Sequence, residues 1–189
     1  MNRRWFWVLA ACLVLDGLLL YFYWHQKRER QYDAVIVAAS QRYRVAPALV
    51  KAVVWRESAF DGRARGRAGE IGLMQITEPA AMEWAQAAKL RDFRHAELYD
   101  PAKNTLAGSW YLRKLIGRYV NTDNPLAYAL ADYNAGRSNV LRWLKGAGAT
   151  NSTAFIKQID FPGTREYVKS VLRRYEHYKP AFRPQLAQN

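Results

Sequence analysis

Residues 47–58 read PALVKAVVWRES and carry the pattern of a buried helix. Pro47 suits the first turn of a helix, where its missing N–H would have no helical partner. The apolar residues that follow recur at intervals of three and four, which is the spacing of one helical face: Leu49, Val50, Val53 and Val54. We therefore expect a helix whose apolar face packs into a protein core.

Glu57 lies on that apolar face, because it follows Val53 by four residues and Val54 by three. Burial raises the pKa of a carboxyl group and keeps it protonated near neutral pH, which is the state that a general acid requires. The alternative is a glutamate at a helix end that pairs with Arg56 or Arg63. Spacing alone leaves both interpretations open.

The chain beyond residue 31 contains repeated signals for the start of a helix, and it has no long alternation of apolar and polar residues of the kind typical of strands. A residue that can cap a helix N-terminus recurs before apolar or alanine-rich segments, at Asp33, Thr77, Asp100, Asn124 and Thr164. The exceptions are the Gly- and Arg-rich segment 62–72 and the short run 71–76. The predicted fold class is mainly α.

The N-terminal segment 5–24 reads WFWVLAACLVLDGLLLYFYW, with Asp16 as its only charge. A helix of this length spans about 30 Å, the thickness of a bilayer core. Tryptophan and tyrosine gather at both ends of the segment, as they do at membrane interfaces. These features predict one transmembrane helix that precedes the globular domain.

Two other interpretations of the N-terminal segment are a cleaved signal peptide and a lipoprotein anchor. A cleaved signal peptide needs a shorter apolar core and a small-residue cleavage site, and neither is evident. Residues 9–12, LAAC, resemble a bacterial lipobox, so a lipoprotein anchored through Cys12 is the minor alternative. Basic residues flank both ends of the segment, so the charge distribution does not fix its orientation.

Composition limits the remaining possibilities. The 29 Lys and Arg exceed the 16 Asp and Glu, giving a net charge of +13 that predicts an anionic partner. Cys12 is the single cysteine, which excludes an intrachain disulfide, and three widely separated histidines give no metal-ligand spacing. We expect no metal and no cofactor. The expected organisation is an anchor with a basic juxtamembrane segment (1–30), a globular domain (31–180) and a polar tail (181–189).

Three further motifs follow Glu57-Ser58 in a fixed order: GLMQI at 72–76, ADYNAG at 131–136 and TREYV at 164–168. Together they resemble the lytic transglycosylases with an SLT-type catalytic domain, glycoside hydrolase family 23, over roughly residues 34–178. The family's last motif commonly has a glutamate where this chain has Gly163, and its proline is displaced to Pro162. That departure concerns the surroundings of Tyr167 more than Glu57.

The resemblance implies a goose-lysozyme-like α fold and cleavage of peptidoglycan between N-acetylmuramic acid and N-acetylglucosamine, with a 1,6-anhydro product. It assigns Glu57 as the single catalytic acid and base. It also implies sugar-binding roles for six further residues: Ser58, Met74, Gln75, Tyr133, Asn134 and Tyr167. Tyr167 is expected to hydrogen-bond Glu57.

Several of these residues also suit a purely structural role. Met74 also suits a core position, because a thioether fills gaps well. Tyr133 and Tyr167 also suit half-buried core positions. Asp61, four residues after Glu57, is the nearest candidate for the second carboxylate that ordinary glycosidases use.

The resemblance also implies partners and a location. The expected partner is the peptidoglycan glycan strand. Arg63, Arg65 and Arg67 of the segment 62–72 are expected to lie beside the cleft and attract the strand's carboxylates, or else to form a solvated loop. The expected location is the bacterial inner membrane, single-pass, with the catalytic domain in the periplasm. The alternatives are a muramidase that hydrolyses the same bond, and a wall-binding component of a secretion or conjugation apparatus. No recognised nucleic-acid motif accompanies the basic charge, so nucleic acid is not an expected partner.

Overall fold

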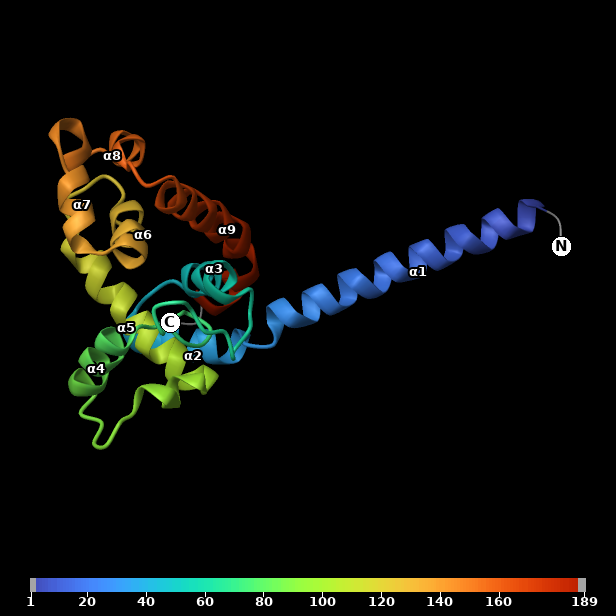
Figure 1. Cartoon of the computed structure of the whole chain (residues 1–189), viewed down its shortest axis with the longest axis horizontal. Coiled ribbons are helices and arrows are strands. Elements are labelled where there is room, and N and C mark those ends of the chain that lie inside the picture. The colour runs from blue at the N-terminus through green and yellow to red at the C-terminus, as the bar shows by residue number, and fades with distance from the viewer. Residues whose placement is uncertain (1–2, 187–189) are drawn as a thin grey trace.

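The computed structural model describes residues 3–186, without the side chains of residues 4–6, 8–9 and 183–186. Its helices form a compact body from which one long helix projects (Figure 1). The α-helices are α1 (Arg3–Arg30), α2 (Asp33–Tyr43), α3 (Pro47–Ser58), α4 (Glu78–Ala87), α5 (Pro101–Arg118), α6 (Pro125–Ala135), α7 (Arg137–Trp143), α8 (Ser152–Gln158) and α9 (Pro162–Leu186), with 3₁₀ turns η1 (His95–Tyr99) and η2 (Gly146–Ala149). The mainly α prediction is confirmed for the described residues.

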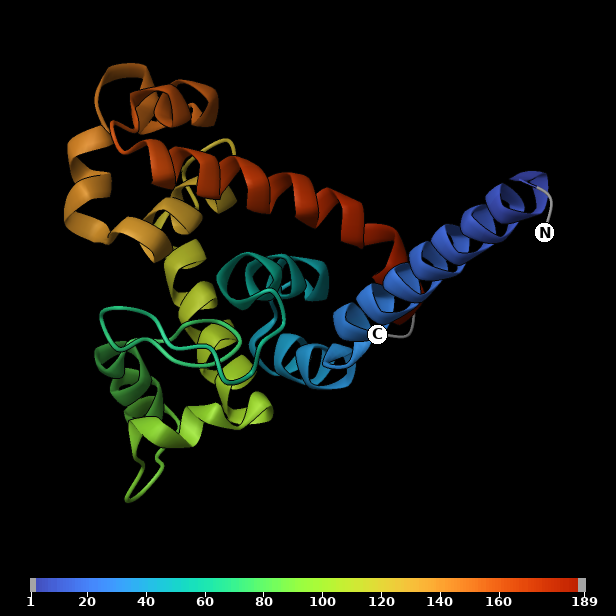
Figure 2. The ribbon, with the colours of Figure 1, turned by 45° about the vertical axis from the view of Figure 1, so that its right-hand side comes forward.

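Helix α3 lies at the centre of the body. It packs against α9 and α2, and α9 runs across it (Figure 2). All of its residues from Pro47 to Val54 are buried, so it is covered on every side rather than on the one face that the sequence predicted. Burial of each Leu or Val side chain stabilises the fold by about 1.5–3 kcal/mol.

An ion pair with a buried lysine joins α3 to α2. The Lys51 side chain is 4% exposed and that of Asp33 35%, and Lys51 Nζ lies 2.6 Å from Asp33 Oδ1. The same ammonium group lies 5.1 Å and 5.5 Å from the ring centres of Tyr178 and Phe182 in α9. Asp33 was predicted to cap α2, but it is the first residue of that helix, and Tyr32 occupies the cap position without a side-chain bond. The carboxylate is engaged by Lys51 instead.

The other predicted caps divide into two groups. Thr77 and Asp100 each accept a hydrogen bond from the backbone N–H three residues on, so both predictions are confirmed. Asn124 precedes α6 without a side-chain capping bond, so that prediction is wrong. The prediction for Thr164 is also wrong, because α9 already begins at Pro162 and the Thr164 hydroxyl donates to Asn134 Oδ1 at 2.8 Å.

The segment between α3 and α4 is held to α5 by one buried amide. Asn104 Oδ1 accepts from the Met74 N–H at 2.8 Å, and Asn104 Nδ2 donates to the carbonyl oxygens of Ile71 and Leu98, each at 2.9 Å. Gly72 has a φ of +78°, and a Cβ there would overlap the Asn104 amide and the Leu98 carbonyl. The glycine of the GLMQI motif is therefore required by both its backbone angle and its surroundings.

Helix α1 projects away from the body in both overall views (Figures 1 and 2). Its large apolar side chains between residues 13 and 24 are at least half exposed, among them Leu13, Leu15, Leu18, Leu19, Leu20 and Phe22. Among the residues described with their side chains, no helix has both the length and the apolar character needed to cross a membrane. The prediction of a transmembrane helix is therefore not supported. The apolar run contains Asp16 and ends before His25, and the side chains of residues 5, 6, 8 and 9 lie outside the description.

The C-terminal boundary predicted at residue 180 falls inside a helix. Helix α9 continues to Leu186, and Phe182 is buried beside Lys51. Residues 187–189 of the predicted tail, like residues 1–2 of the predicted anchor, lie outside the described residues. The division into anchor, domain and tail stays a prediction.

The bonds of Asn104 predict a large effect of its removal. Asn104→Ala leaves buried backbone groups of Met74, Ile71 and Leu98 unpaired, and each such group costs about 1–3 kcal/mol. We expect the free energy of unfolding in urea to fall by at least about 3 kcal/mol. The matched variant Asn139→Ala removes one half-buried amide bond, to the Ala135 carbonyl, and should cost about 1 kcal/mol or less. Equal losses in the two variants would contradict this role of Asn104.

Candidate active site

Glu57 lies in the last turn of α3, where two hollows meet. One, the large hollow, has a volume of about 670 Å³, and the other, the small hollow, about 280 Å³. Both are lined by Glu57 and Gln75, and Glu57 itself is half-buried. The chain turns sharply after α3, because Ala59 and Phe60 both have left-handed backbone angles, with φ of 47° and 64°. This turn exposes the end of α3 to both hollows.

The predicted hydrogen bond between Tyr167 and Glu57 is present. The Tyr167 hydroxyl donates to Glu57 Oε1 at 2.6 Å, and the Tyr167 side chain is 2% exposed. The packing of α9 on α3 brings these residues together from 110 positions apart in the chain. The Arg56 guanidinium lies 5.6 Å from the centre of the Tyr167 ring. Tyr167 therefore interacts with both the catalytic candidate and a cation.

The pKa of Glu57 is raised to about 7. Burial is the main cause, and the negative charge of Glu70 adds to it; the Tyr167 hydrogen bond and the charge of Arg56 oppose it. At neutral pH both the acid and the carboxylate of Glu57 are therefore well populated. A group in that condition can give a proton in one step and take one in the next.

Ser58 ties the loop 59–77 to the end of α3, and Gln75 joins two parts of that loop to each other. The Ser58 hydroxyl donates to the Leu73 carbonyl oxygen at 2.8 Å. Gln75 Nε2 donates to the carbonyl oxygens of Ala64 and Gly72, at 3.1 Å and 2.9 Å. Both side chains also line the large hollow. Their amide and hydroxyl groups are thus held in place at its wall.

The other predicted sugar-binding residues occupy different environments. Met74 is fully buried against Gly108, where a Cβ would overlap its sulfur, so its side chain has the core position that the sequence left open. Its carbonyl oxygen accepts from the Tyr133 hydroxyl at 2.7 Å. Tyr133 and Asn134 line the small hollow, and the bond from Thr164 orients the Asn134 amide.

Glu70 and Glu166 each share a hollow with Glu57, and neither is the second carboxylate that the sequence suggested. Asp61 is exposed and lines a third hollow, where its Oδ1 accepts from the Arg63 N–H at 2.9 Å. Glu70 lines the small hollow with Glu57, and its Oε2 accepts from the Ala68 N–H at 3.0 Å. Sequence distance from Glu57 favoured Asp61, but after Ala59 the loop lines the two hollows again only from Ala64 onward, and Glu70 is its carboxylate there.

Sequence reasoning also missed one face of α9. Glu166, Ser170 and Arg173 line the large hollow, and Arg173 pairs with Glu166 at 2.9 Å. Their spacing of four and three residues is that of one helical face, and their position directly beside Tyr167 was the available signal.

The arginines of the loop do not act as one group. Arg65 lines the large hollow and Arg67 the small one, whereas Arg63 lines the third hollow with Asp61. The expectation that all three lie beside the cleft is therefore wrong for Arg63. The cause is the Asp61–Arg63 turn, which directs this part of the loop away from Glu57.

Comparison with known proteins gives consistent matches. The family model described as Transglycosylase SLT domain matches residues 34–156. The soluble lytic murein transglycosylase of Salmonella typhimurium is 30% identical over 94% of this chain and 27% of its own length. The membrane-bound lytic murein transglycosylase C of Pectobacterium atrosepticum is 32% identical over 61% of this chain and 34% of its own length.

A solved structure shares the fold. The lytic transglycosylase Slt of Pseudomonas aeruginosa, crystallised as an inactive mutant, superposes with a TM-score of 0.72 at 28% identity, over 79% of this chain and 24% of that one. This chain therefore corresponds to about a quarter of the length of the larger relatives that it matches.

The raised pKa predicts that Glu57 destabilises the fold at high pH. The folded protein holds this proton up to a pH of about 7, whereas the unfolded chain releases it near 4.5, so stability is lost as pH rises between these values. Glu57→Gln cannot ionise, so we expect it to raise the free energy of unfolding at pH 8 by up to about 3 kcal/mol, and to have little effect at pH 4.

Urea unfolding at the two pH values measures this difference. The matched variant Glu83→Gln removes an exposed carboxylate on α4 and should change stability by less than about 1 kcal/mol at either pH. A Glu57→Gln gain of the same size at pH 4 and pH 8 would show that the effect does not come from titration.

Proposed function

This chain belongs to the transglycosylase SLT domain family, and from that membership we propose that it is a lytic transglycosylase of peptidoglycan. The proposed reaction breaks the β-1,4 bond between N-acetylmuramic acid and N-acetylglucosamine. One observation carries the proposal: a carboxyl group with a pKa of about 7, held by Tyr167, stands where two hollows meet.

The proposed reaction needs two proton transfers, and the carboxyl group of Glu57 performs both. Protonated Glu57 gives its proton to the glycosidic oxygen as the bond from that oxygen to C1 of the muramoyl residue breaks. The Glu57 carboxylate then takes the proton of the C6 hydroxyl while the C6 oxygen bonds to C1. The product is a 1,6-anhydro sugar, Glu57 regains its proton, and no water is consumed.

The two hollows offer binding sites on either side of the bond that is cleaved. A glycan strand laid through both would place its scissile oxygen at Glu57. Arg65 and Arg173 line the large hollow and Arg67 the small one, and guanidinium groups bind carboxylates of the kind that peptide stems carry. The proposed substrate-binding roles of Ser58, Gln75, Tyr133 and Asn134 fit the same path, whereas Tyr167 acts on Glu57.

Hydrolysis of the same bond is the second candidate function, and Glu70 is the observation that favours it. A retaining or inverting glycosidase needs a second carboxylate. Glu70 lines the small hollow and its charge raises the pKa of Glu57. A carboxylate in that hollow could activate a water molecule for attack on the sugar. Asp61 lines neither of the two hollows that meet at Glu57.

We propose that α1 holds the chain at a bacterial inner membrane with the body in the periplasm, where peptidoglycan lies. The support is the row of exposed leucines on α1, which costs free energy in water and gains it in lipid. Binding of the whole chain to neutral phosphatidylcholine vesicles tests this proposal. Lipidation of Cys12 and a role within a secretion or conjugation apparatus stay predictions.

Product analysis separates the two reactions. The whole chain, in mild detergent, is incubated with purified murein and the soluble products are analysed by liquid chromatography and mass spectrometry. We expect anhydro-muropeptides, lighter than the hydrolysed products by one water, and a loss of at least about 10³-fold in their rate for Glu57→Gln. Glu70→Gln should keep the anhydro product.

The contrary results are equally specific. Reducing-end products that disappear in Glu70→Gln would assign the chain as a hydrolase. Equal product release by the wild type and Glu57→Gln would remove Glu57 from the mechanism.

A further inference from the structure

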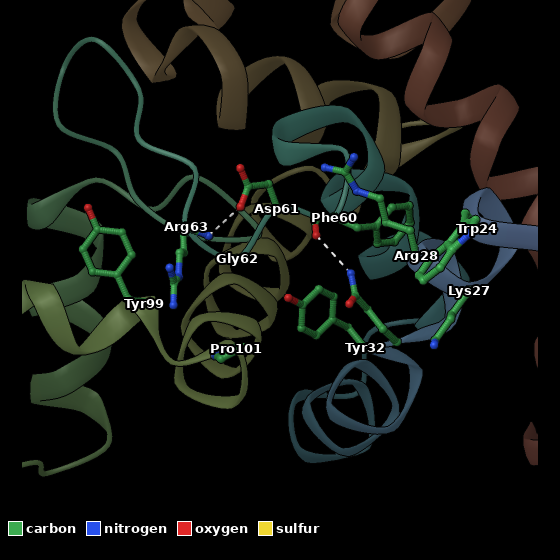
Figure 3. Close-up of a pocket in the computed structure, with 11 residues that line it drawn as sticks. Trp24, Lys27, Arg28, Tyr32, Phe60, Asp61, Gly62, Arg63, Tyr99 and Pro101 are labelled. Carbon is green, nitrogen blue, oxygen red and sulfur yellow. Dashed lines mark hydrogen bonds between the residues drawn. The ribbon is translucent and has the colours of Figure 1, made fainter. Parts of the chain in front are cut away.

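A third hollow lies where α1 meets the body, away from Glu57. This junction pocket has a volume of about 670 Å³. Figure 3 shows Trp24, Lys27 and Arg28 of α1 along one side and Arg63 on the other, with Tyr32 between them. Neither proton transfer nor glycan binding, as proposed above, uses this pocket.

Cations dominate the junction pocket. Lys27, Arg28 and Arg63 are all exposed and line it, against the single carboxylate of Asp61. That carboxylate already accepts the Arg63 N–H at 2.9 Å, which fixes it in the loop. The nearby Glu29 pairs with Arg174 of α9 at 3.7 Å and does not line the pocket. The pocket therefore has a net positive charge and suits an anion.

The pocket has a fixed frame. Gln31 Nε2 donates to the Phe60 carbonyl oxygen at 3.3 Å, which ties the segment after α1 to the loop after α3 (Figure 3). Tyr32 Oη lies 3.1 Å from the point that a Cβ on Gly62 would occupy. The absence of a side chain at Gly62 thus keeps space open beside the tyrosine hydroxyl.

Its position along α1 identifies the anion. The exposed apolar run of α1 ends at Trp24, and Lys27 follows after three residues, about 4.5 Å further along a helix. Tryptophan at the end of an apolar helix favours the headgroup level of a bilayer. If α1 enters lipid, the pocket opens at the depth of the lipid phosphates.

We infer that the junction pocket binds the phosphate of an anionic phospholipid headgroup. This inference rests on the proposed membrane association of α1. Guanidinium groups bind phosphate through two parallel N–H bonds, and Arg28 and Arg63 line opposite sides of the pocket. Lys27 adds a point charge, and the Tyr32 hydroxyl is a further donor. Bound lipid would join α1 to the loop that leads from α3 and thereby set the body at a fixed height above the membrane.

The test compares partition of the whole chain into vesicles of phosphatidylcholine alone and of phosphatidylcholine with phosphatidylglycerol. We expect Arg28→Gln with Arg63→Gln to lower partition into the anionic vesicles about 30-fold and to leave partition into the neutral vesicles unchanged. The control, Arg91→Gln with Arg113→Gln, removes the same charge from exposed sites outside the pocket and should cost less than about threefold.

A second variant keeps the charge and closes the pocket. Gly62→Leu places a side chain against the Tyr32 hydroxyl, in a backbone conformation outside the left-handed region. We expect it to remove the preference for anionic vesicles without any change in net charge. Murein cleavage by each variant in detergent checks that the protein is folded, because none of these residues belongs to the proposed catalytic site.

Each contrary result has a distinct meaning. No binding of the wild type to neutral vesicles overturns the membrane association of α1. Binding with an anionic preference that Gly62→Leu leaves intact overturns the pocket and indicates diffuse attraction. Equal loss in the control pair does the same. If millimolar glycerol phosphate lowers binding of the wild type to anionic vesicles to the level measured with neutral vesicles, the pocket is a site for soluble phosphates. None of these results bears on the proposed cleavage of murein, which is measured separately.

Discussion

The removal of water from one carboxyl group is the constraint on which the rest of the site depends. Glu57 lies in the last turn of a helix whose residues 47–54 are all buried, so its carboxyl is partly removed from water and its pKa rises to about 7. The Tyr167 hydroxyl then limits that rise by donating to the carboxylate form. The free energy of unfolding near neutral pH is thus lower than it would be without this buried carboxyl group, which can act there as both an acid and a base.

The structure around Glu57 is arranged to keep this environment rigid. Lys51 and Asp33 join α3 to α2, and Tyr178 of α9 lies over the same ammonium group. Asn104 accepts a hydrogen bond from the Met74 N–H in the loop 59–77, and the Met74 carbonyl oxygen accepts one from the Tyr133 hydroxyl. Helix position and loop position are therefore set by separate buried polar contacts, and both converge on the end of α3.

Local signals in the sequence predicted the helices and Glu57, but not the partners that the chain brings from a distance. Pro47, Thr77 and Asp100 act within a few residues, so their helix starts could be predicted. Asp33 and Thr164 look like caps, yet their side chains are engaged by Lys51 and Asn134 from other helices. Tyr167 was found through the family resemblance alone.

Loop geometry explains the remaining errors. Asp61 is closer to Glu57 in the chain than Glu70, but two left-handed residues turn the loop away before it returns to the site. The three alternate arginines diverge into three hollows for the same reason. Backbone angles of non-glycine residues in such a turn are not encoded in a pattern that sequence reasoning can use.

The titration of Glu57 itself tests the central claim most directly. Carbon-13 NMR of the glutamate side-chain carboxyls, with Glu57 assigned by the signal missing from Glu57→Gln, follows its protonation against pH. The account predicts a midpoint near 7, well above the ordinary glutamate value of 4.5. A midpoint near 4.5 would contradict it, because the carboxyl would then be ionised at neutral pH and unable to protonate a glycosidic oxygen.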